Sequence, residues 1–253
     1  MPGDKQNLIK MESTTLVPTH IAIIMDGNRR WARKHNLPVL AGHQHVADKI
    51  LEPLVEHAAE LGIKYLTFWA WSTENWQRNS KEIEGVMRIF RHVIRKRWQR
   101  LHAKGVRIKV IGDLSKFSPD IQEALKKVVV QTKDNKKITA VFALNYGGRD
   151  ELIRTFKQLT RKILDTVHSL DEARQQCNNI TMKQLSERLD TAGVPDPDLI
   201  IRTGGERRLS GFLPWQSIYS ELIFPSWYMP EFVPEKLDEV IGEYQKRSRR
   251  FGK

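Results

Sequence analysis

The sequence predicts an α/β fold in which helices flank both faces of a central, mainly parallel β-sheet. Along the chain, short apolar runs that are typical of buried strands alternate with longer stretches that are typical of amphipathic helices. This alternation favours parallel strands, because a crossover helix must carry the chain back between them. The 253 residues contain no internal repeat and no low-complexity linker. We therefore expect a flexible N-terminal tail over residues 1–17 and a single domain over residues 18–253.

The predicted strands are short runs rich in β-branched, aromatic and other apolar residues. They cover residues 21–25, 63–71, 106–111, 138–144 and 199–202, and a sixth lies within 215–224. The first strand ends abruptly in Asp26-Gly27-Asn28, which is a turn sequence. The basic residues that follow it suit the first turns of a helix.

The remaining predicted helices occupy the longer stretches between the strands. They cover residues 42–61, 80–104, 120–133, 150–170, 181–189 and 234–250. Gly62 and Gly105 stand where glycine commonly ends a helix, and Thr181 is a suitable N-cap. Pro53 has no backbone N–H, so we expect a bend or a break in its helix. The polar stretch around residues 175–179 is predicted to be a connection.

The composition is that of a soluble globular protein, with 40% hydrophobic and 28% charged residues. The longest apolar runs are much shorter than the roughly 20 residues that span a bilayer, and the N-terminus has no apolar signal core. A single cysteine, Cys177, excludes both a disulfide framework and a cysteine zinc site. We expect a cytoplasmic protein.

The formal net charge of +12 indicates an anionic partner or substrate. Basic residues gather in residues 29–34, 88–107, 202–208 and 246–253. The second group lies on a stretch with an apolar stripe, which is typical of a surface helix with a solvated basic face. The alternative is peripheral contact with anionic lipid headgroups. Nucleic acid is not the expected partner, because no zinc finger, basic zipper or RNA-recognition signature is present.

Polar clusters follow four of the predicted strands. They are residues 26–30, 72–78, 145–149 and 202–210, and Glu221 follows the last of them. The carboxyl ends of parallel strands lie at one edge of a sheet, where ligands bind, so we expect these clusters to converge. Gly-Gly turns let backbone amides approach an anion, and arginines grip phosphate oxygens. Asp26 and Glu221 are oxygen ligands suited to a magnesium ion that also binds phosphate.

Each cluster alone could be an ordinary strand-end turn with surface charges, but four of them together predict a polyphosphate site. The sequence has no Gly-x4-Gly-Lys-Ser/Thr phosphate loop and no Gly-x-Gly-x-x-Gly fingerprint. It also has no Gly-x-Ser-x-Gly elbow. The predicted phosphate grip therefore depends on arginines and backbone amides.

Several segments resemble the signature segments of the cis-prenyltransferases, the undecaprenyl diphosphate synthase family. They are HIAIIMDGNRRW at 20–31, STENWQR at 72–78, NYGGR at 145–149 and the stretch 202–221, in the family's order and spacing. The resemblance extends over residues 18–252. It implies a homodimer with an apolar tunnel between sheet and helices, and a single catalytic domain. It also implies magnesium-dependent, head-to-tail condensation of isopentenyl diphosphate with an allylic diphosphate.

The resemblance also assigns expected roles to individual residues of this chain. The residues expected at the reaction centre are Asp26, Asn28, His43, Ser72, Glu74 and Asn75. Those expected to bind the allylic diphosphate are Gly27, Asn28, Arg29, Arg30, Trp31, His43 and Arg78. Those expected to bind isopentenyl diphosphate are Arg202, Arg208, Ser210, Arg250 and Gly252, the last two from a tail that reaches the partner subunit. Asp26 and Glu221 are the expected magnesium ligands, and the expected tunnel residues are Phe68, Ala70, Trp76 and Phe142.

The default expectation is farnesyl diphosphate as primer and undecaprenyl diphosphate as product. Bulky rings on the second and fourth strands, including Phe68 and Phe142, favour a short product instead if one of them forms the tunnel floor. Val39 stands where many family members have an arginine, so we expect the allylic diphosphate to be bound more weakly or in a different arrangement. An irregular, head-to-middle synthase of the same fold is a further alternative. A non-catalytic partner subunit and a basic nucleic-acid-binding module are the remaining, weaker alternatives.

Overall fold

The computed structural model describes residues 17–247 and contains a six-stranded, fully parallel sheet within them. The spatial order is β3-β4-β2-β1-β5-β6. The strands are β1 His20–Ile24, β2 Tyr65–Ser72, β3 Val106–Ile111, β4 Ile138–Tyr146, β5 Leu199–Arg202 and β6 Glu221–Ile223. Each pairs in parallel with its neighbours. The predicted α/β fold with a parallel sheet is confirmed.

Helices connect these strands and close the chain. They are α1 Asn28–Lys34, α2 Leu40–His45, η1 Val46–Ile50, α3 Leu51–Glu60, η2 Thr73–Gln77, α4 Ser80–Lys96, α5 Trp98–Ala103, η3 Leu114–Lys116, α6 Pro119–Thr132, α7 Gly148–Thr166, α8 Leu170–Asn178, α9 Met182–Ser186, η4 Met229–Glu231 and α10 Pro234–Gln245. Thr181 caps α9 as predicted, since its side chain accepts a hydrogen bond from the N–H of Gln184.

Three helical segments differ from the prediction. The helix expected over 42–61 is divided into α2 and α3 by the π-helical turn η1, which lies just before Pro53. Pro53 cannot donate to the carbonyl of Lys49, so the regular helical ladder is interrupted at this point. The helix expected over 80–104 is divided into α4 and α5 at Arg97. The connection expected at 175–179 is wrong, because most of it lies in α8, whose N-cap is Ser169.

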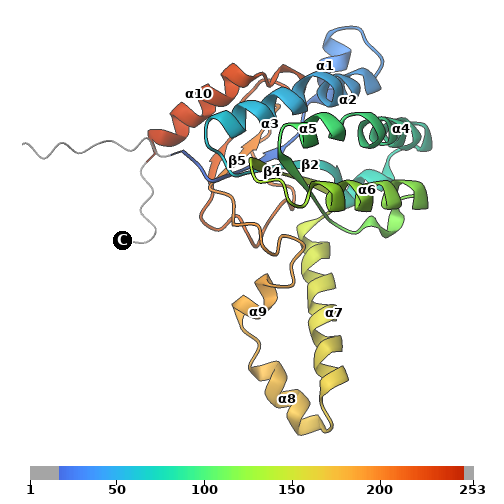
Figure 1. Cartoon of the computed structure of the whole chain (residues 1–253), viewed down its shortest axis with the longest axis vertical. Helices are drawn as coiled ribbons and strands as arrows, with labels where there is room; N and C mark the ends of the chain where they lie inside the picture. The colour runs from blue at the N-terminus through green and yellow to red at the C-terminus, as the bar shows by residue number, and fades with distance from the viewer. Residues whose placement is uncertain (1–16, 248–253) are drawn as a thin grey trace, which may run out of the picture.

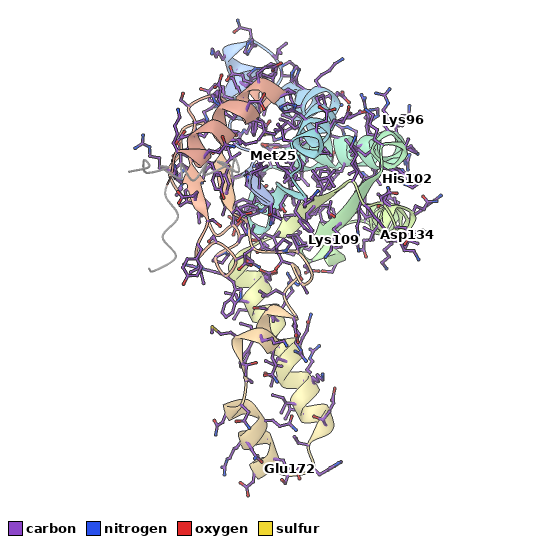
Figure 2. The ribbon with its side chains drawn as sticks, turned by 60° about the vertical axis from the view of Figure 1, so that its left-hand side comes forward. Met25, Lys96, His102, Lys109, Asp134 and Glu172 are labelled. Carbon is purple, nitrogen blue, oxygen red and sulfur yellow. The ribbon has the colours of Figure 1, made fainter. Side chains whose placement is uncertain are left out.

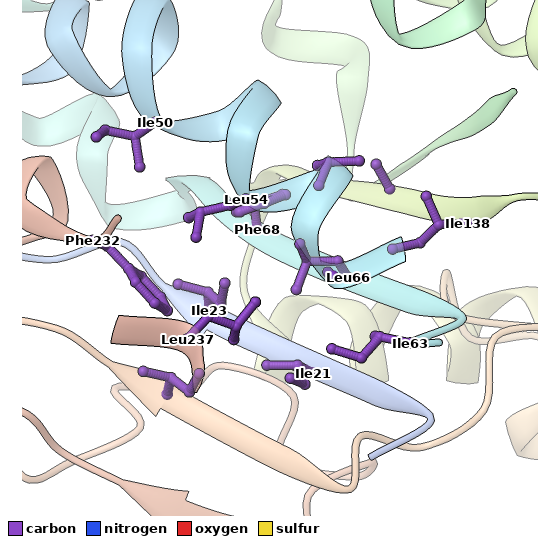
Figure 3. Packing of buried hydrophobic residues seen from close by; sticks show 14 of the residues in the cluster. Ile21, Ile23, Ile50, Leu54, Ile63, Leu66, Phe68, Ile138, Phe232 and Leu237 are labelled. Carbon is purple, nitrogen blue, oxygen red and sulfur yellow. The ribbon is translucent and has the colours of Figure 1, made fainter. Parts of the chain in front are cut away.

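The two faces of the sheet are covered differently (Figure 1). The helices α3, α4, α5, α6 and α10 lie over one face, whereas α7, α8 and α9 extend from the other side as an arm, with Glu172 near its tip (Figure 2). Under α3 and α10, the core packs strand residues such as Ile23 and Leu66 against Leu54 and Leu237 (Figure 3). On the opposite face, the main covering residues are Phe212 and Leu213 from the segment between β5 and β6.

The strand register determines which polar residues can meet. Ile24 of β1 pairs with Arg202 of β5, so Asp26 and the residues after Arg202 lie together at the carboxyl edge of the sheet. Glu221 pairs with Leu199, at the opposite end of β5. Among the described residues, no helix is both long and apolar enough to cross a membrane.

Candidate active site

A cavity of about 350 Å³ lies between the sheet and its helical layer. Most of its lining is apolar and comes from η1, α3, α4, α5, α6 and the strands β2, β3 and β4. Polar residues gather at the end beside the carboxyl edge of the sheet, which we call the mouth. They are Asp26, Asn28, His43, Ser72, Asn75, Arg78, Arg202 and Ser210. The cavity corresponds to the predicted apolar tunnel.

Asp26 is the centre of the charged cluster at the mouth. One carboxylate oxygen accepts a hydrogen bond from Arg202 Nη2 at 2.9 Å, and the other lies 3.2 Å from Arg30 Nη2. The guanidinium of Arg202 also donates to Ser210 Oγ at 2.8 Å, and that of Arg30 donates to the carbonyl of Gly204 at 2.8 Å. Two arginines therefore converge on one carboxylate, leaving a net positive mouth that suits an anion.

Close backbone packing brings the elements of the mouth together. Gly27 adopts φ +95°, and a Cβ there would lie 2.5 Å from the ring of Tyr228. A Cβ on Gly42 would lie 2.1 Å from the carbonyl oxygen of Asn28, so the start of α1 and α2 can touch only because this residue is glycine. This contact holds His43 of α2 beside the turn that carries Asp26.

Buried polar atoms without a partner mark the same place. Five such side-chain atoms occur among the described residues, and four belong to residues that line the cavity. These four are Asn28 Oδ1, His43 Nε2, Trp71 Nε1 and Arg202 Nε. Buried polar groups in folded proteins are nearly always hydrogen-bonded, so their concentration here indicates a site that is completed by a polar ligand.

His43 is held in its neutral form. Burial, together with the positive charge of Arg78, lowers the pKa of His43 from 6.5 to about 4. At neutral pH the ring can therefore donate or accept a hydrogen bond but carries no charge. Arg78 is itself paired with Glu82 at 2.8 Å and lies over the ring of Trp71 at 5.4 Å.

The segment after β2 is fixed by local capping. The N–H of Ser72 donates to Asn75 Oδ1 at 3.1 Å in a capping box at the start of η2. Both residues line the cavity, whereas Glu74 from the same turn is exposed and outside the lining. The expected reaction-centre residues therefore gather at the mouth with the exception of Glu74.

Several other expected residues lie outside the lining. Arg29 is exposed, Trp31 packs at a tilt against His35 and His45, and Arg208 pairs with Glu206. Of the four expected tunnel residues, Ala70 and Phe142 line the cavity. Phe68 is fully buried behind the lining and stacks on Phe142 at 5.5 Å, and Trp76 packs on Trp71 and Phe117. Arg250 and Gly252 lie outside the described residues.

Within one chain, Glu221 does not lie beside Asp26. It is the first residue of β6, it pairs with Leu199, and its carboxylate accepts a hydrogen bond from Arg247 at 3.0 Å. The sequence analysis grouped Glu221 with the polar cluster that follows β5, but Glu221 begins β6, at the opposite edge of the sheet from the mouth. The expected pairing of Asp26 and Glu221 at one metal is therefore not formed by a single chain.

The mouth nevertheless fits a magnesium ion that is shared with substrate. No group of three or more His, Cys, Asp or Glu side chains among residues 17–247 could hold a metal by itself. Magnesium, however, is commonly held by one or two carboxylates with phosphate oxygens and waters. Asp26 is partly exposed and stands beside two arginines that suit phosphate, which is a donor set of that kind.

Sequence reasoning missed two residues that support Asp26. Thr203 Oγ1 accepts from the N–H of Asp26 at 2.9 Å and donates to its carbonyl at 2.6 Å. Its position directly after Arg202 could have suggested this role. Tyr228 packs over Gly27, with Arg30 5.2 Å from its ring centre. No local pattern indicates Tyr228, because it arrives from a distant part of the chain.

Comparisons with known proteins show the family to which the chain belongs. A family model described as "Putative undecaprenyl diphosphate synthase" matches residues 24–252. Isoprenyl transferases from Rhizobium meliloti and Agrobacterium fabrum are 45% and 42% identical to this chain, each covering 93% of it and 92% of the relative.

Two solved structures are also similar to this chain. The lavandulyl diphosphate synthase from Lavandula x intermedia, in complex with dimethylallyl diphosphate, has a TM-score of 0.86 at 31% identity, covering 94% of this chain and 99% of that one. A probable undecaprenyl diphosphate synthase from Campylobacter jejuni has a TM-score of 0.75 at 30% identity, covering 93% and 99%. The chain therefore belongs to the undecaprenyl diphosphate synthase family of isoprenyl transferases.

Proposed function

We propose that this prenyltransferase condenses isopentenyl diphosphate head-to-tail with an allylic diphosphate, with farnesyl diphosphate as primer and undecaprenyl diphosphate as the default product. The observation that carries the proposal is the junction of a charged mouth, built on Asp26, Arg30 and Arg202, with an apolar cavity of about 350 Å³. A prenyl diphosphate has the same division into an anionic head and an apolar tail. Because the cavity lining runs from Ile24 to Ser210, we further propose a single catalytic domain.

Different residues at the mouth bind the two diphosphates. Arg30 and the amides from Gly27 onward hold the allylic diphosphate, while Arg202 and Ser210 hold that of isopentenyl diphosphate, with Arg208 as an expected further ligand. Asp26 stands between the two arginines and orients both. The allylic carbon–oxygen bond breaks, the new carbon–carbon bond forms, and a proton leaves C2 of the isopentenyl unit. A diphosphate oxygen and the Asp26 carboxylate are the two candidate acceptors.

Magnesium is the proposed cofactor, and Asp26 would hold it together with phosphate oxygens of the substrates. When bound, it would neutralise charge on the departing diphosphate. Neutral His43 and Asn28 each have a buried polar atom without a partner at the mouth, where the reacting groups would lie. The apolar wall beyond them keeps water away from the allylic carbon, because few groups there can hydrogen-bond to it.

A short-chain or head-to-middle synthase is the second candidate. It is favoured by the lavandulyl diphosphate synthase, a similar structure that is in complex with dimethylallyl diphosphate, a smaller primer than farnesyl diphosphate. Phe142 on the cavity lining also favours it, because a bulky ring there limits the space for a growing chain.

We propose that the protein is a homodimer that associates through the arm. Large apolar residues are exposed on it, among them Ile153, Phe156, Leu164, Leu170 and Met182. Exposed apolar patches of this kind mark protein interfaces. Phe156→Asp should convert a dimer to a monomer in light scattering, and an unchanged mass would exclude α7 from the interface.

We also propose peripheral contact with anionic membrane surfaces through exposed basic residues of α4, of α5, of the turn after α5 and of β3. These are Arg88, Arg95, Lys96, Arg100, Lys104 and Arg107. Such contact should weaken as salt rises, because charges at a membrane surface are screened within a Debye length. Co-sedimentation with phosphatidylglycerol vesicles, but not with phosphatidylcholine vesicles, would support it.

The function is tested by incubation with labelled isopentenyl diphosphate and farnesyl diphosphate, with and without magnesium, followed by sizing of the products. A magnesium-dependent ladder that ends near eleven isoprene units supports the default proposal. A stop after one or two additions, or activity with dimethylallyl diphosphate alone, supports the second candidate. No product with farnesyl, geranyl or dimethylallyl diphosphate would contradict prenyl transfer and favour a partner subunit. Salt-sensitive DNA binding would then favour a nucleic-acid module.

A further inference from the structure

The charged residues that line the cavity fall into two groups. Asp26, Arg78 and Arg202 lie at the mouth and belong to the diphosphate site. Glu52 and Arg97 line a different part of the wall, between α3 and the start of α5, and the proposed reaction has no use for them there.

This part of the wall is a seam between two helical pairs. On one side, η1 and α3 contribute Ala47 and Leu51 to the lining, and on the other side, α4 and α5 contribute Ile94 and Trp98. The two pairs thus contribute to opposite sides of the same seam, and their apolar residues pack against one core cluster. A set of charges along the rim of the seam also joins them.

These charges form an ion-pair row, made of Asp48, Glu52 and Glu56 with Arg97, Arg100 and Lys104. Arg97 Nη2 donates to Asp48 at 2.8 Å. Lys104 Nζ donates to Glu52 at 2.9 Å and also to Glu56, and Arg100 lies 3.7 Å from Glu52. The acidic residues recur every four positions and therefore lie on one side of their helical segment, facing the basic residues of α5 and of the residues that flank it.

The ion-pair row is suited to opening. Its members are partly exposed, from 20% for Glu52 to 63% for Arg100, so water and salt weaken each pair. Both helical pairs are also interrupted at this level, by the π-turn η1 on one side and by the break at Arg97 on the other. Interruptions of the helical ladder are places where a helix can bend.

We propose that the ion-pair row is a lateral latch that limits product length. While the latch is closed, the growing isoprenoid chain is confined to the cavity, and elongation stops when the cavity is full. When the latch opens, the apolar tail passes between α3 and α5, and elongation continues. This inference rests on the proposed prenyl transfer and assigns product length to a side wall in addition to the lining at Phe142.

The test is the triple variant Asp48→Asn, Glu52→Gln, Glu56→Gln, which keeps the shapes of the side chains but removes their charges. With excess isopentenyl diphosphate, we expect its main product to be longer than that of the wild type by at least one isoprene unit. Raising the ionic strength from roughly 0.05 to 0.5 M should lengthen the wild-type product and leave that of the variant unchanged. The matched control is Asp120→Asn, which breaks an exposed pair with Arg91 between α6 and α4, away from the seam. It should leave product length unchanged.

A second readout needs no turnover. The uptake of diphenylhexatriene by the substrate-free protein should be several-fold faster in the triple variant than in the wild type and the control. A wild type without prenyl transfer to any primer would overturn the proposed function, and dye uptake would then test the latch alone. Unchanged uptake in a variant that melts normally would overturn the latch. Faster uptake with an unchanged product would overturn its role in product length.

Discussion

The mouth of the cavity and its apolar end are built in different ways. At the mouth, directional hydrogen bonds fix Asp26 between Arg202 and Arg30, and glycines allow backbone to touch backbone. At the apolar end, residues such as Leu101 and Val128 are held by side-chain packing, and partly exposed ion pairs lie along the side wall. Under the proposed function, we therefore expect the mouth to determine whether reaction occurs, and the apolar end to determine which product forms and to contribute more to stability. Substitutions at the two ends should therefore change different observables.

Asp26→Asn should cause the largest loss of activity. The variant keeps the shape of the side chain but removes the charge that orients Arg30 and Arg202 and would help to hold magnesium. We expect prenyl transfer to fall roughly 10³- to 10⁴-fold, with little change in product length. The measurement is kcat with farnesyl diphosphate, beside the melting temperature. Asp171→Asn, which removes an exposed pair with Arg174 on the arm, is the control. A rate within tenfold of the wild type would contradict the assignment.

Phe68→Ala and Phe142→Ala should separate stability from product length. The two rings stack on each other, but only Phe142 lines the cavity. Phe68 is fully buried, so its replacement should cost about 3–4 kcal/mol of unfolding free energy in urea titration, without longer products. Phe142→Ala should lengthen the product, because it enlarges the cavity directly. Longer products from Phe68→Ala alone would show that the floor of the cavity has been placed wrongly.

The strands were predictable because each is an apolar run bounded by turn residues. β3 and β5 begin and end as predicted. The helix α8 was missed because none of its residues is buried, so it lacks the apolar stripe by which helices are recognised. The break at Arg97 was missed because no proline or glycine marks it.

The candidate site was predictable where residues follow the carboxyl end of a strand, as Asp26 and the residues after Arg202 do. Glu221 was misplaced because its residue type suggested a ligand, whereas its position depends on the register of β6, which the sequence pattern does not give. Phe68 and Phe142 show the same limit. Both lie on neighbouring strands, but only the packing decides which ring reaches the cavity.

Two histidines, His20 in β1 and His43 beside the carboxyl end of β1, should lower the free energy of unfolding at acid pH. Burial lowers the pKa of both His20 and His43 from 6.5 to about 4. The unfolded chain binds these protons first, so stability should be greatest above about pH 6.5 and fall as the pH drops toward 4. His20, which is 2% exposed, should account for about 3 kcal/mol of that loss.

A ligand distinguishes the two histidines. Inorganic diphosphate bound at the mouth should favour the protonated form of His43. It should therefore reduce the loss of unfolding free energy that His43 causes at low pH, and leave the loss caused by His20 unchanged. Urea titrations between pH 4 and 7, with and without diphosphate, measure this. The His43→Gln variant should show no effect of diphosphate on the pH slope. An effect that persists in this variant would place the responding group elsewhere.

Tyr228 should have the smallest effect, confined to substrate affinity at the mouth. Its ring lies 5.2 Å from the Arg30 guanidinium carbon, and the next residue, Met229, donates its N–H to the carbonyl of Asp26 at 2.9 Å. Tyr228→Leu keeps apolar packing over Gly27 but removes the cation–π contact, which is worth about 1–2 kcal/mol. The KM for the allylic diphosphate should therefore rise about 5- to 30-fold, with little change in kcat or product length. Tyr228→Phe keeps the ring and should resemble the wild type. If Tyr228→Phe raised KM as much as Tyr228→Leu, the hydroxyl of Tyr228 would be the group that supports binding. If either variant changed product length, the mouth and the apolar end would not be separable.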